Sequence, residues 1–268
     1  MMKFNIKSIQ LPHRLKLEYV EQGDRNGVPV IFLHGITDSW RSFELVLPHL
    51  PKSVRAFALS QRGHGESERP PSGYRPRDFA DDVAAFMDAL ELPRAIIVGH
   101  SMGSYVAQCF AINYPERTQK LVLVGSFTTL RSNSGMQEFW DTGISKLEDP
   151  IDSNFALEFQ KSTLAQPIPE GYLETVVRES MKLPARVWRA AFQDLMEANL
   201  FNALDKITAP TLIIWGDQDT YFLHEEQDAL AAKIAGSKLV VYNGTGHALH
   251  WEEPQRFAAD LLAFIEKH

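Results

Sequence analysis

The segment from Ala95 to Ala111, AIIVGHSMGSYVAQCFA, places a serine where a buried strand turns sharply into a helix. The corner has the pattern Gly-x-Ser-x-Gly, with Gly99 and Gly103 flanking Ser101. A serine at such a corner needs a strained backbone and small neighbours, and its hydroxyl then stands clear of the sheet. The helix N-terminus behind it favours developing negative charge. The pattern predicts a nucleophilic serine; the alternative is a plain strand–turn–helix whose glycines only ease packing.

Composition excludes several classes of function. The formal net charge is −7 and no basic run occurs, so nucleic acid is not expected as a partner. The sequence contains no run of about 18 apolar residues, so no membrane span is expected. The N-terminus lacks the apolar core of a signal peptide. The single cysteine, Cys109, allows no internal disulfide, so we expect a cytoplasmic protein. No Cys/His cluster has metal-ligand spacing, and neither a metal nor a cofactor is expected.

Strand-like and helix-like segments alternate along most of the chain. Strands are predicted over residues 15–20, 28–33, 54–59, 95–98, 121–124, 211–215 and 239–242, and helices over residues 41–49, 76–90, 102–114, 223–233 and 255–266. Such alternation is typical of an α/β fold, in which a mainly parallel sheet is covered by helices on both faces.

Residues 127–200 interrupt this alternation. They contain no good strand, and the segment is helix-like, rich in large apolar residues and broken by four prolines. The simplest interpretation is a core formed by residues 1–126 and 201–268, with residues 127–200 inserted as a helical cap. The alternative is a set of further covering helices with no role as a lid.

A serine hydroxyl needs an adjacent base, and the base needs an acid that orients it. The strand over residues 211–215 leads into Asp217 and Asp219, and the strand over residues 239–242 leads into His247 and, beyond it, His250. The carboxyl ends of parallel strands share one edge of a sheet. We therefore expect Ser101, one of the aspartates and a histidine to gather there.

Five motifs together resemble the α/β-hydrolase superfamily and occur in its order: FLHG (Phe32–Gly35), RGHGES (Arg62–Ser67), VGHSMG (Val98–Gly103), PTLIIWGDQD (Pro210–Asp219) and GTGHALHWEEP (Gly244–Pro254). The resemblance implies a mostly parallel eight-stranded sheet with a cap inserted after the sixth strand. It assigns the nucleophile to Ser101, the base to His247 and the acid to Asp219, in preference to His250 and Asp217. Some relatives carry the acid after the sixth strand, where this chain has Gly125 and Ser126.

A developing oxyanion needs fixed hydrogen-bond donors. The N–H of Met102, directly after the nucleophile, is the first candidate. The second is the N–H of Ile36, in the loop after His34-Gly35, and Ile36 also suits an apolar pocket wall. His34, His64 and His100 are interpreted as structural.

Large apolar side chains suggest the kind of substrate. Trp40, Trp140, Trp188 and Phe192 are the candidate substrate-binding residues, and such residues suit a non-ionic compound. The sequence therefore predicts a serine hydrolase that cleaves a carboxylic ester or lactone of a small, largely apolar substrate through an acyl-enzyme on Ser101. Its partners would be that substrate and water, and the chain would be a monomer or a homodimer.

Two alternatives stay open. The first is a C–C bond hydrolase, or another acyl-transfer enzyme, with the same three residues. Many C–C hydrolases carry a glycine-rich segment after the His-Gly pair, whereas this chain reads Ile36-Thr37-Asp38. The second alternative is a ligand receptor on the same fold that does not turn its ligand over.

Overall fold

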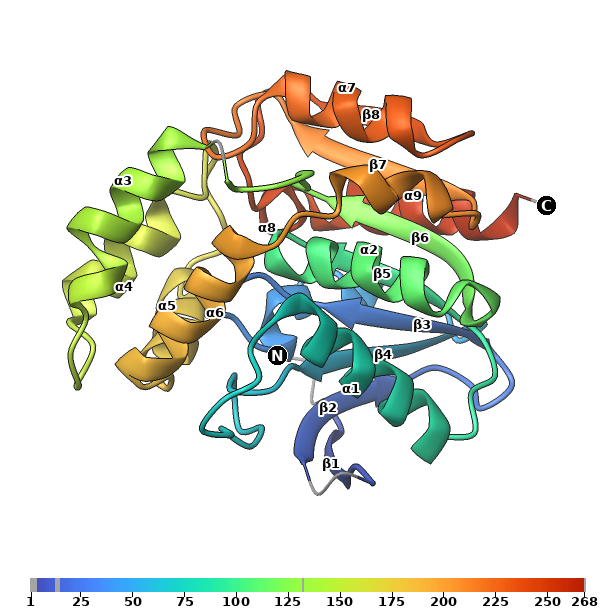
Figure 1. Cartoon of the computed structure of the whole chain (residues 1–268). Coiled ribbons are helices and arrows are strands. Elements are labelled where there is room, and N and C mark those ends of the chain that lie inside the picture. Colours follow the sequence, from blue (N-terminus) through green and yellow to red (C-terminus); the bar gives the residue numbers. More distant parts are fainter. Residues whose placement is uncertain (1–3, 13–14, 132, 268) are drawn as a thin grey trace.

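The computed structural model describes residues 4–12, 15–131 and 133–267. An eight-stranded sheet forms its centre, with the strand order β1-β2-β4-β3-β5-β6-β7-β8 (Figure 1). The strands are β1 (Ile6–Gln10), β2 (Lys16–Gln22), β3 (Val28–Leu33), β4 (Val54–Ser60), β5 (Ala95–His100), β6 (Thr118–Val124), β7 (Thr211–Gly216) and β8 (Lys238–Tyr242). β2 is antiparallel to both neighbours, and β3 to β8 run parallel. The mostly parallel eight-stranded sheet is therefore confirmed.

Both faces of the sheet are covered, which explains why β3 is apolar throughout. Ile31 and Leu33 belong to one apolar cluster with helices α1 (Pro76–Ala89), α2 (Met102–Asn113) and α7 (His224–Lys233). Val30 and Phe32 belong to a second cluster on the other face, with α9 (Pro254–Glu266) and two short 3-10 helices. A strand buried on both sides needs apolar residues at every position.

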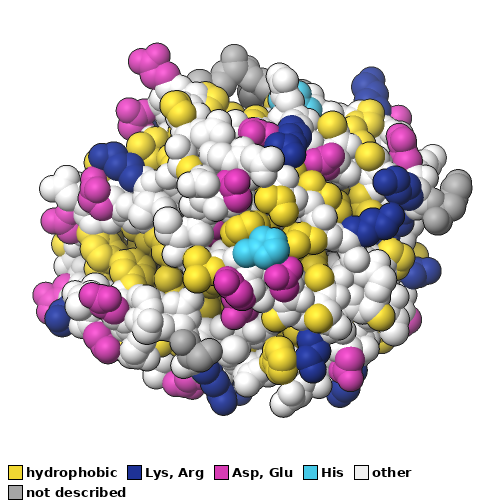
Figure 2. Space-filling model, turned by 90° about the horizontal axis from the view of Figure 1, so that it is seen from above, with side chains coloured by type: hydrophobic (Ala, Val, Ile, Leu, Met, Phe, Trp, Pro, Cys, Tyr) yellow, Lys and Arg dark blue, Asp and Glu magenta, His cyan; other side chains and the backbone are white. Residues whose placement is uncertain are grey.

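The helices between β6 and β7 lie together beyond one end of the sheet (Figure 1). They are α3 (Ser134–Thr142), α4 (Ser153–Lys161), α5 (Tyr172–Met181) and α6 (Ala185–Glu197), and we call them the cap helices. An isolated antiparallel bridge between Thr129 and Asn199 joins the chain where it leaves the core and returns to it. Figure 2 shows hydrophobic side chains gathered at this end of the molecule, while acidic and basic side chains are interspersed over the rest of that face.

Two local predictions differ from the structure. The segment over residues 41–49 forms two 3-10 helices, η1 (Trp40–Phe43) and η2 (Leu47–His49), instead of one helix; Pro48 lacks the N–H that a continuous helix would use. β1 was not predicted, because it is an edge strand whose Ile6 is 50% exposed and leaves little apolar pattern. None of the helices in the described part of the chain has the length and apolar character to cross a membrane.

Gly103 lies where α2 packs tightly against the sheet. A Cβ on this residue would lie 2.2 Å from the backbone oxygen of Leu33 in β3, so no larger residue fits without a backbone shift. We expect Gly103→Ala to lower the free energy of unfolding by on the order of 3 kcal/mol, measured by urea denaturation. Gly135→Ala is the control, because a Cβ there meets only the side chain of Asn133 at 3.4 Å. Equal stability of the two variants would contradict this account of the elbow.

Candidate active site

Ser101 stands at the corner between β5 and α2 in a strained backbone conformation. Its φ is 52° and its ψ is −120°, a combination that non-glycine residues rarely adopt and that is stored at functional sites. The corner can close because residue 99 is a glycine. A Cβ at this position would lie only 2.2 Å from the backbone oxygen of Gly103. The N–H of Ser101 donates to the carbonyl of Val124 at 2.9 Å. The elbow predicted from Gly-x-Ser-x-Gly is thus present in the fold.

His247 and Asp219 come together from the loops that follow β8 and β7. Nδ1 of His247 lies 2.8 Å from Oδ2 of Asp219, and both side chains are buried. The other carboxylate oxygen accepts the N–H groups of Tyr221 and Phe222 at 2.8 and 3.2 Å, which fixes its orientation. Since a carboxylate only accepts, Nδ1 of His247 donates this hydrogen bond, and in the neutral imidazole Nε2 is then the nitrogen that can accept a proton.

The competing aspartate and histidine have other contacts. Asp217 is exposed, and its Oδ1 accepts the N–H of Gly244 at 2.6 Å, so it shapes the turn and does not contact His247. His250 is fully buried, and its Nε2 lies 3.2 Å from the hydroxyl of Ser42.

Ser101 and His247 line the same cavity. Gly125 makes room for the imidazole: its φ is 50°, and a Cβ there would lie 2.9 Å from Nδ1 and Cε1 of His247. Within the described part of the chain, Oγ of Ser101 forms no hydrogen bond, so no other group occupies the hydroxyl. The hydrogen bond between a catalytic serine and its histidine base is often long in the free enzyme and tightens only in the substrate complex.

Two backbone N–H groups are the candidate donors to an oxyanion. Met102 is the first residue of α2, so its N–H has no partner inside the helix. Ile36 lines the cavity, and its N–H donates to none of the residues that the structure describes. Ile36 is thus both a wall of the cavity and a free donor.

Buried, uncharged imidazoles frame the loops. Burial lowers the pKa of His34 and of His100 well below the ordinary value. Nε2 of His34 accepts the N–H of Gln61 at 2.9 Å, so its Nδ1 donates to the carbonyl of Gly35 at 2.7 Å. Nε2 of His100 donates to the carbonyl of His247 at 3.1 Å. These residues hold the main chain of the site, as the structural interpretation expects.

The cavity lies between the cap helices and the carboxyl edge of the sheet, and part of it is open to solvent. Its walls are mostly apolar, and Asp38 is the only carboxylate among the described lining residues, with no lysine or arginine. The lining residues are Gly35, Ile36, Asp38, His100, Ser101, Phe127, Leu130, Met136, Phe139, Phe159, Gln160, Thr163, Phe192, Leu195, Tyr221, Phe222, His247 and Trp251.

Of the four side chains predicted to bind substrate, only Phe192 lines this cavity. Trp40 does not line it: this residue belongs to the second apolar cluster, with Val30 and Phe32 of β3, and lies edge-on to Phe4 with ring centroids 5.3 Å apart. Trp140 stacks on Phe192 with ring centroids 6.1 Å apart and is not among the lining residues. Trp188 is fully buried in the cap, where it packs against Phe159.

The family model described as "Alpha/beta hydrolase family" matches residues 30–260. The chain belongs to this family. This α/β hydrolase is 29% identical over 250 residues to the 2-hydroxymuconate semialdehyde hydrolase of Pseudomonas sp. (strain CF600), which covers 89% of this chain and 87% of that protein. It is 24% identical over 268 residues to the 3-oxoadipate enol-lactonase 2 of Acinetobacter baylyi, over 98% of each. The esterase RhEst1 from Rhodococcus sp. ECU1013 superposes with a TM-score of 0.85 at 26% identity, over 98% of each chain.

Sequence reasoning missed the polar side chains of the cavity in this α/β hydrolase. Asp38 follows the His-Gly pair by three residues, and Gln160 and Thr163 lie at the end of α4 and just beyond it. The position of Asp38 in the predicted oxyanion loop could have indicated that it lines the cavity. No sequence pattern indicated this for Gln160, because its position depends on how the cap helices pack. No group of three or more His, Cys, Asp or Glu residues in the described chain could hold a metal ion.

Asp38 is a buried carboxyl, 3% exposed. Burial raises its pKa from 3.8 to about 7, against the opposing effect of hydrogen bonds from Gln160 and Ser42. The nearby charged groups act in opposite directions, since His247 lowers this pKa and Glu179 raises it. Its protonated form is therefore favoured up to about neutral pH.

This pKa makes the stability of the α/β hydrolase depend on pH. Because the folded-state value is the higher one, the contribution of Asp38 is fully present below pH 4 and is lost as the pH rises towards 7. The difference between 3.8 and about 7 corresponds to about 4 kcal/mol. We expect the free energy of unfolding of Asp38→Asn, relative to wild type, to rise by about 3 kcal/mol between pH 5 and pH 8 in urea titrations. The exposed Asp205→Asn is the control for loss of one charge; a difference for Asp38→Asn that does not change with pH would contradict the assignment.

Proposed function

We propose that this α/β hydrolase cleaves a carboxylic ester or lactone of a small, uncharged and largely apolar substrate through an acyl-enzyme on Ser101. The observation that carries the proposal is the 2.8 Å bond between His247 and Asp219, since His247 lines the same cavity as Ser101. A nucleophile, a base and an orienting acid are the groups that acyl transfer needs.

Each residue has a defined role in the proposed reaction. Nε2 of His247 takes the proton of Ser101 as Oγ attacks the acyl carbon, and Asp219 holds the imidazolium that forms. The N–H groups of Ile36 and Met102 donate to the oxyanion. The protonated imidazole then gives its proton to the leaving oxygen. A water molecule, deprotonated by His247, releases the acid and restores Ser101.

The charge of the cavity supports an uncharged substrate. Asp38 is the only acidic side chain in its described lining, and no lysine or arginine is there to pair with an anion. Moving an unpaired carboxylate from water into an apolar site costs several kcal/mol. Relatives whose names contain muconate or oxoadipate therefore do not predict an acidic substrate for this chain.

A matched pair of esters tests this proposal. We expect p-nitrophenyl butyrate to be turned over with a kcat/KM at least about 100-fold higher than mono-p-nitrophenyl succinate, which differs by a terminal carboxylate. Lactones and 2-hydroxymuconate semialdehyde complete the panel, the latter because a relative bears its name. A preference for the succinate would contradict the uncharged substrate. Turnover of the semialdehyde alone would favour the C–C alternative, and one stoichiometric burst without turnover would favour a receptor.

A further inference from the structure

Thr37 has a backbone conformation that its side chain disfavours. It is fully buried with φ 70°, in the left-handed region that a β-branched residue rarely adopts. Such strain persists only where the surrounding structure enforces it. Thr37 directly follows Ile36, the proposed oxyanion donor, so the conformation of Thr37 helps to fix the loop that carries this N–H.

Two cap helices hold this loop through one amide group. Nε2 of Gln160, in α4, lies 3.0 Å from Oδ1 of Asp38, 3.3 Å from Oγ1 of Thr37 and 2.8 Å from Oγ of Ser180 in α5. The Thr37 and Ser180 hydroxyls lie 3.0 Å apart. All four residues are buried. The cap thus contacts the side chains of two consecutive loop residues, including the strained one.

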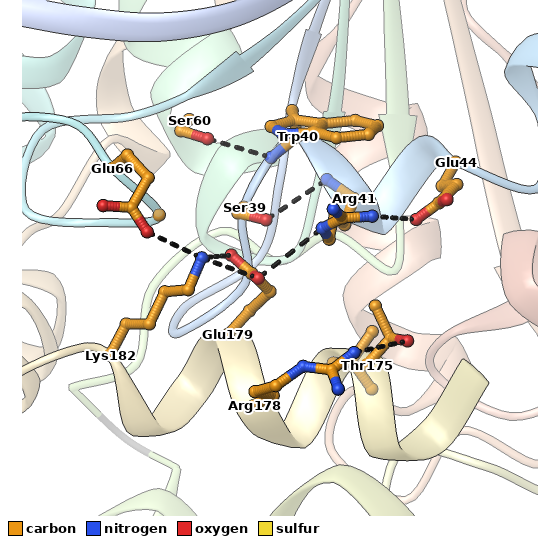
Figure 3. A network of polar contacts seen from close by, with 12 residues as sticks. Ser39, Trp40, Arg41, Glu44, Ser60, Glu66, Thr175, Arg178, Glu179 and Lys182 are labelled. Carbon is orange, nitrogen blue, oxygen red and sulfur yellow. Dashed lines mark hydrogen bonds and ion pairs between the residues drawn. The ribbon is translucent and has the colours of Figure 1, made fainter. Parts of the chain in front are cut away.

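Ion pairs also connect the end of α5 to the core, including the segment that follows the loop over residues 35–38 (Figure 3). Glu179, next to Ser180, lies 3.6 Å from Nε of Arg41 and 2.9 Å from Lys182. Lys182 in turn lies 2.9 Å from Glu66 of the core. The last turn of α5 is therefore held near Arg41, which follows the loop, and near Glu66, in the segment after β4, and both contacts restrict the position of Ser180.

We propose that Gln160 and Ser180 are positioning residues: they hold Thr37 in its left-handed conformation and thereby keep the N–H of Ile36 where it can donate to the oxyanion. This inference rests on the proposed function. It makes the cap helices part of the reaction's machinery and not only the wall of the cavity. An oxyanion donor acts in the transition state and not in the ground state, so its displacement changes kcat and leaves KM in place.

The test is a double-mutant cycle between the amide and the strained residue. Gln160→Met keeps the size of the side chain and removes its hydrogen bonds. We expect it to lower kcat about 100-fold with KM within about threefold, measured per site titrated with a phosphonate. Thr37→Gly removes the strain, because glycine adopts this φ freely. In that background Gln160→Met should cost about tenfold or less. Gln193→Met, on the exposed face of α6, is the control.

A crystal structure of Gln160→Met gives a second readout, independent of activity. We expect Thr37 to leave the left-handed region and the loop over residues 35–38 to move. The inference would be overturned if Thr37 kept a φ near 70° in Gln160→Met and kcat were unchanged. It would also be overturned if Gln160→Met lowered kcat by the same factor in wild type and in Thr37→Gly. Wild-type protein that turned over no member of the panel would instead contradict the proposed function, and the conformation of Thr37 in the variant alone would then decide whether Gln160 holds the loop.

Discussion

Ser101→Ala is expected to lower kcat for p-nitrophenyl butyrate by about 10⁶-fold. The substitution removes the oxygen that would form the covalent intermediate, and neither His247 nor the backbone donors can replace it. The elbow should keep its shape, because the N–H bond to Val124 and the two glycines do not involve the hydroxyl. Steady-state kinetics give the loss, and circular dichroism with urea denaturation checks the fold.

Ser134→Ala is the matched control, since Ser134 is exposed at the start of α3. Its kcat should stay within about twofold of wild type. Activity of Ser101→Ala at more than about a hundredth of the wild-type rate would place the nucleophile elsewhere.

Asp219→Asn should have the second-largest effect, a loss of about 10⁴-fold in kcat. The asparagine oxygen can still accept the N–H groups of Tyr221 and Phe222. Its amide N–H would then face Nδ1 of His247, which moves the imidazole proton to Nε2 and leaves no lone pair for the serine. Stopped-assay kinetics over pH 6 to 9 measure the loss, which should persist across the range.

Asp217→Asn separates the two neighbouring aspartates. Asp217 contacts Gly244 in the turn and not the imidazole, so we expect this variant to retain activity within about threefold. A larger loss for Asp217→Asn than for Asp219→Asn would show that the 2.8 Å contact to His247 is not the productive one.

The parts of the site that follow directly from strands were predictable. Each of Ser101, Asp219 and His247 lies one to five residues beyond a strand of the parallel part of the sheet, and parallel strands bring their carboxyl ends to one edge whatever the intervening chain does. The elbow needed only local information, because its two glycines and its serine lie within five residues of each other.

Features that depend on packing between distant segments were not predictable. Trp40 follows the predicted oxyanion loop closely in sequence, yet its side chain belongs to the second apolar cluster and not to the cavity. Gln160 meets Asp38 across a separation of 122 residues, and only the arrangement of the cap helices brings them together. Gly125 was partly informative. A glycine at this position excluded it as the acid that some relatives carry there, and the structure adds that the absence of a side chain makes room for His247.

Covalent labelling tests the central claim most directly. A fluorophosphonate reacts with a serine hydroxyl that is activated by a base, losing fluoride as the oxygen bonds to phosphorus. Incubation with this reagent, followed by digestion and tandem mass spectrometry, should yield one adduct per chain, on Ser101. A chain that turns over esters yet carries the label on any other residue, or no label, would contradict the account.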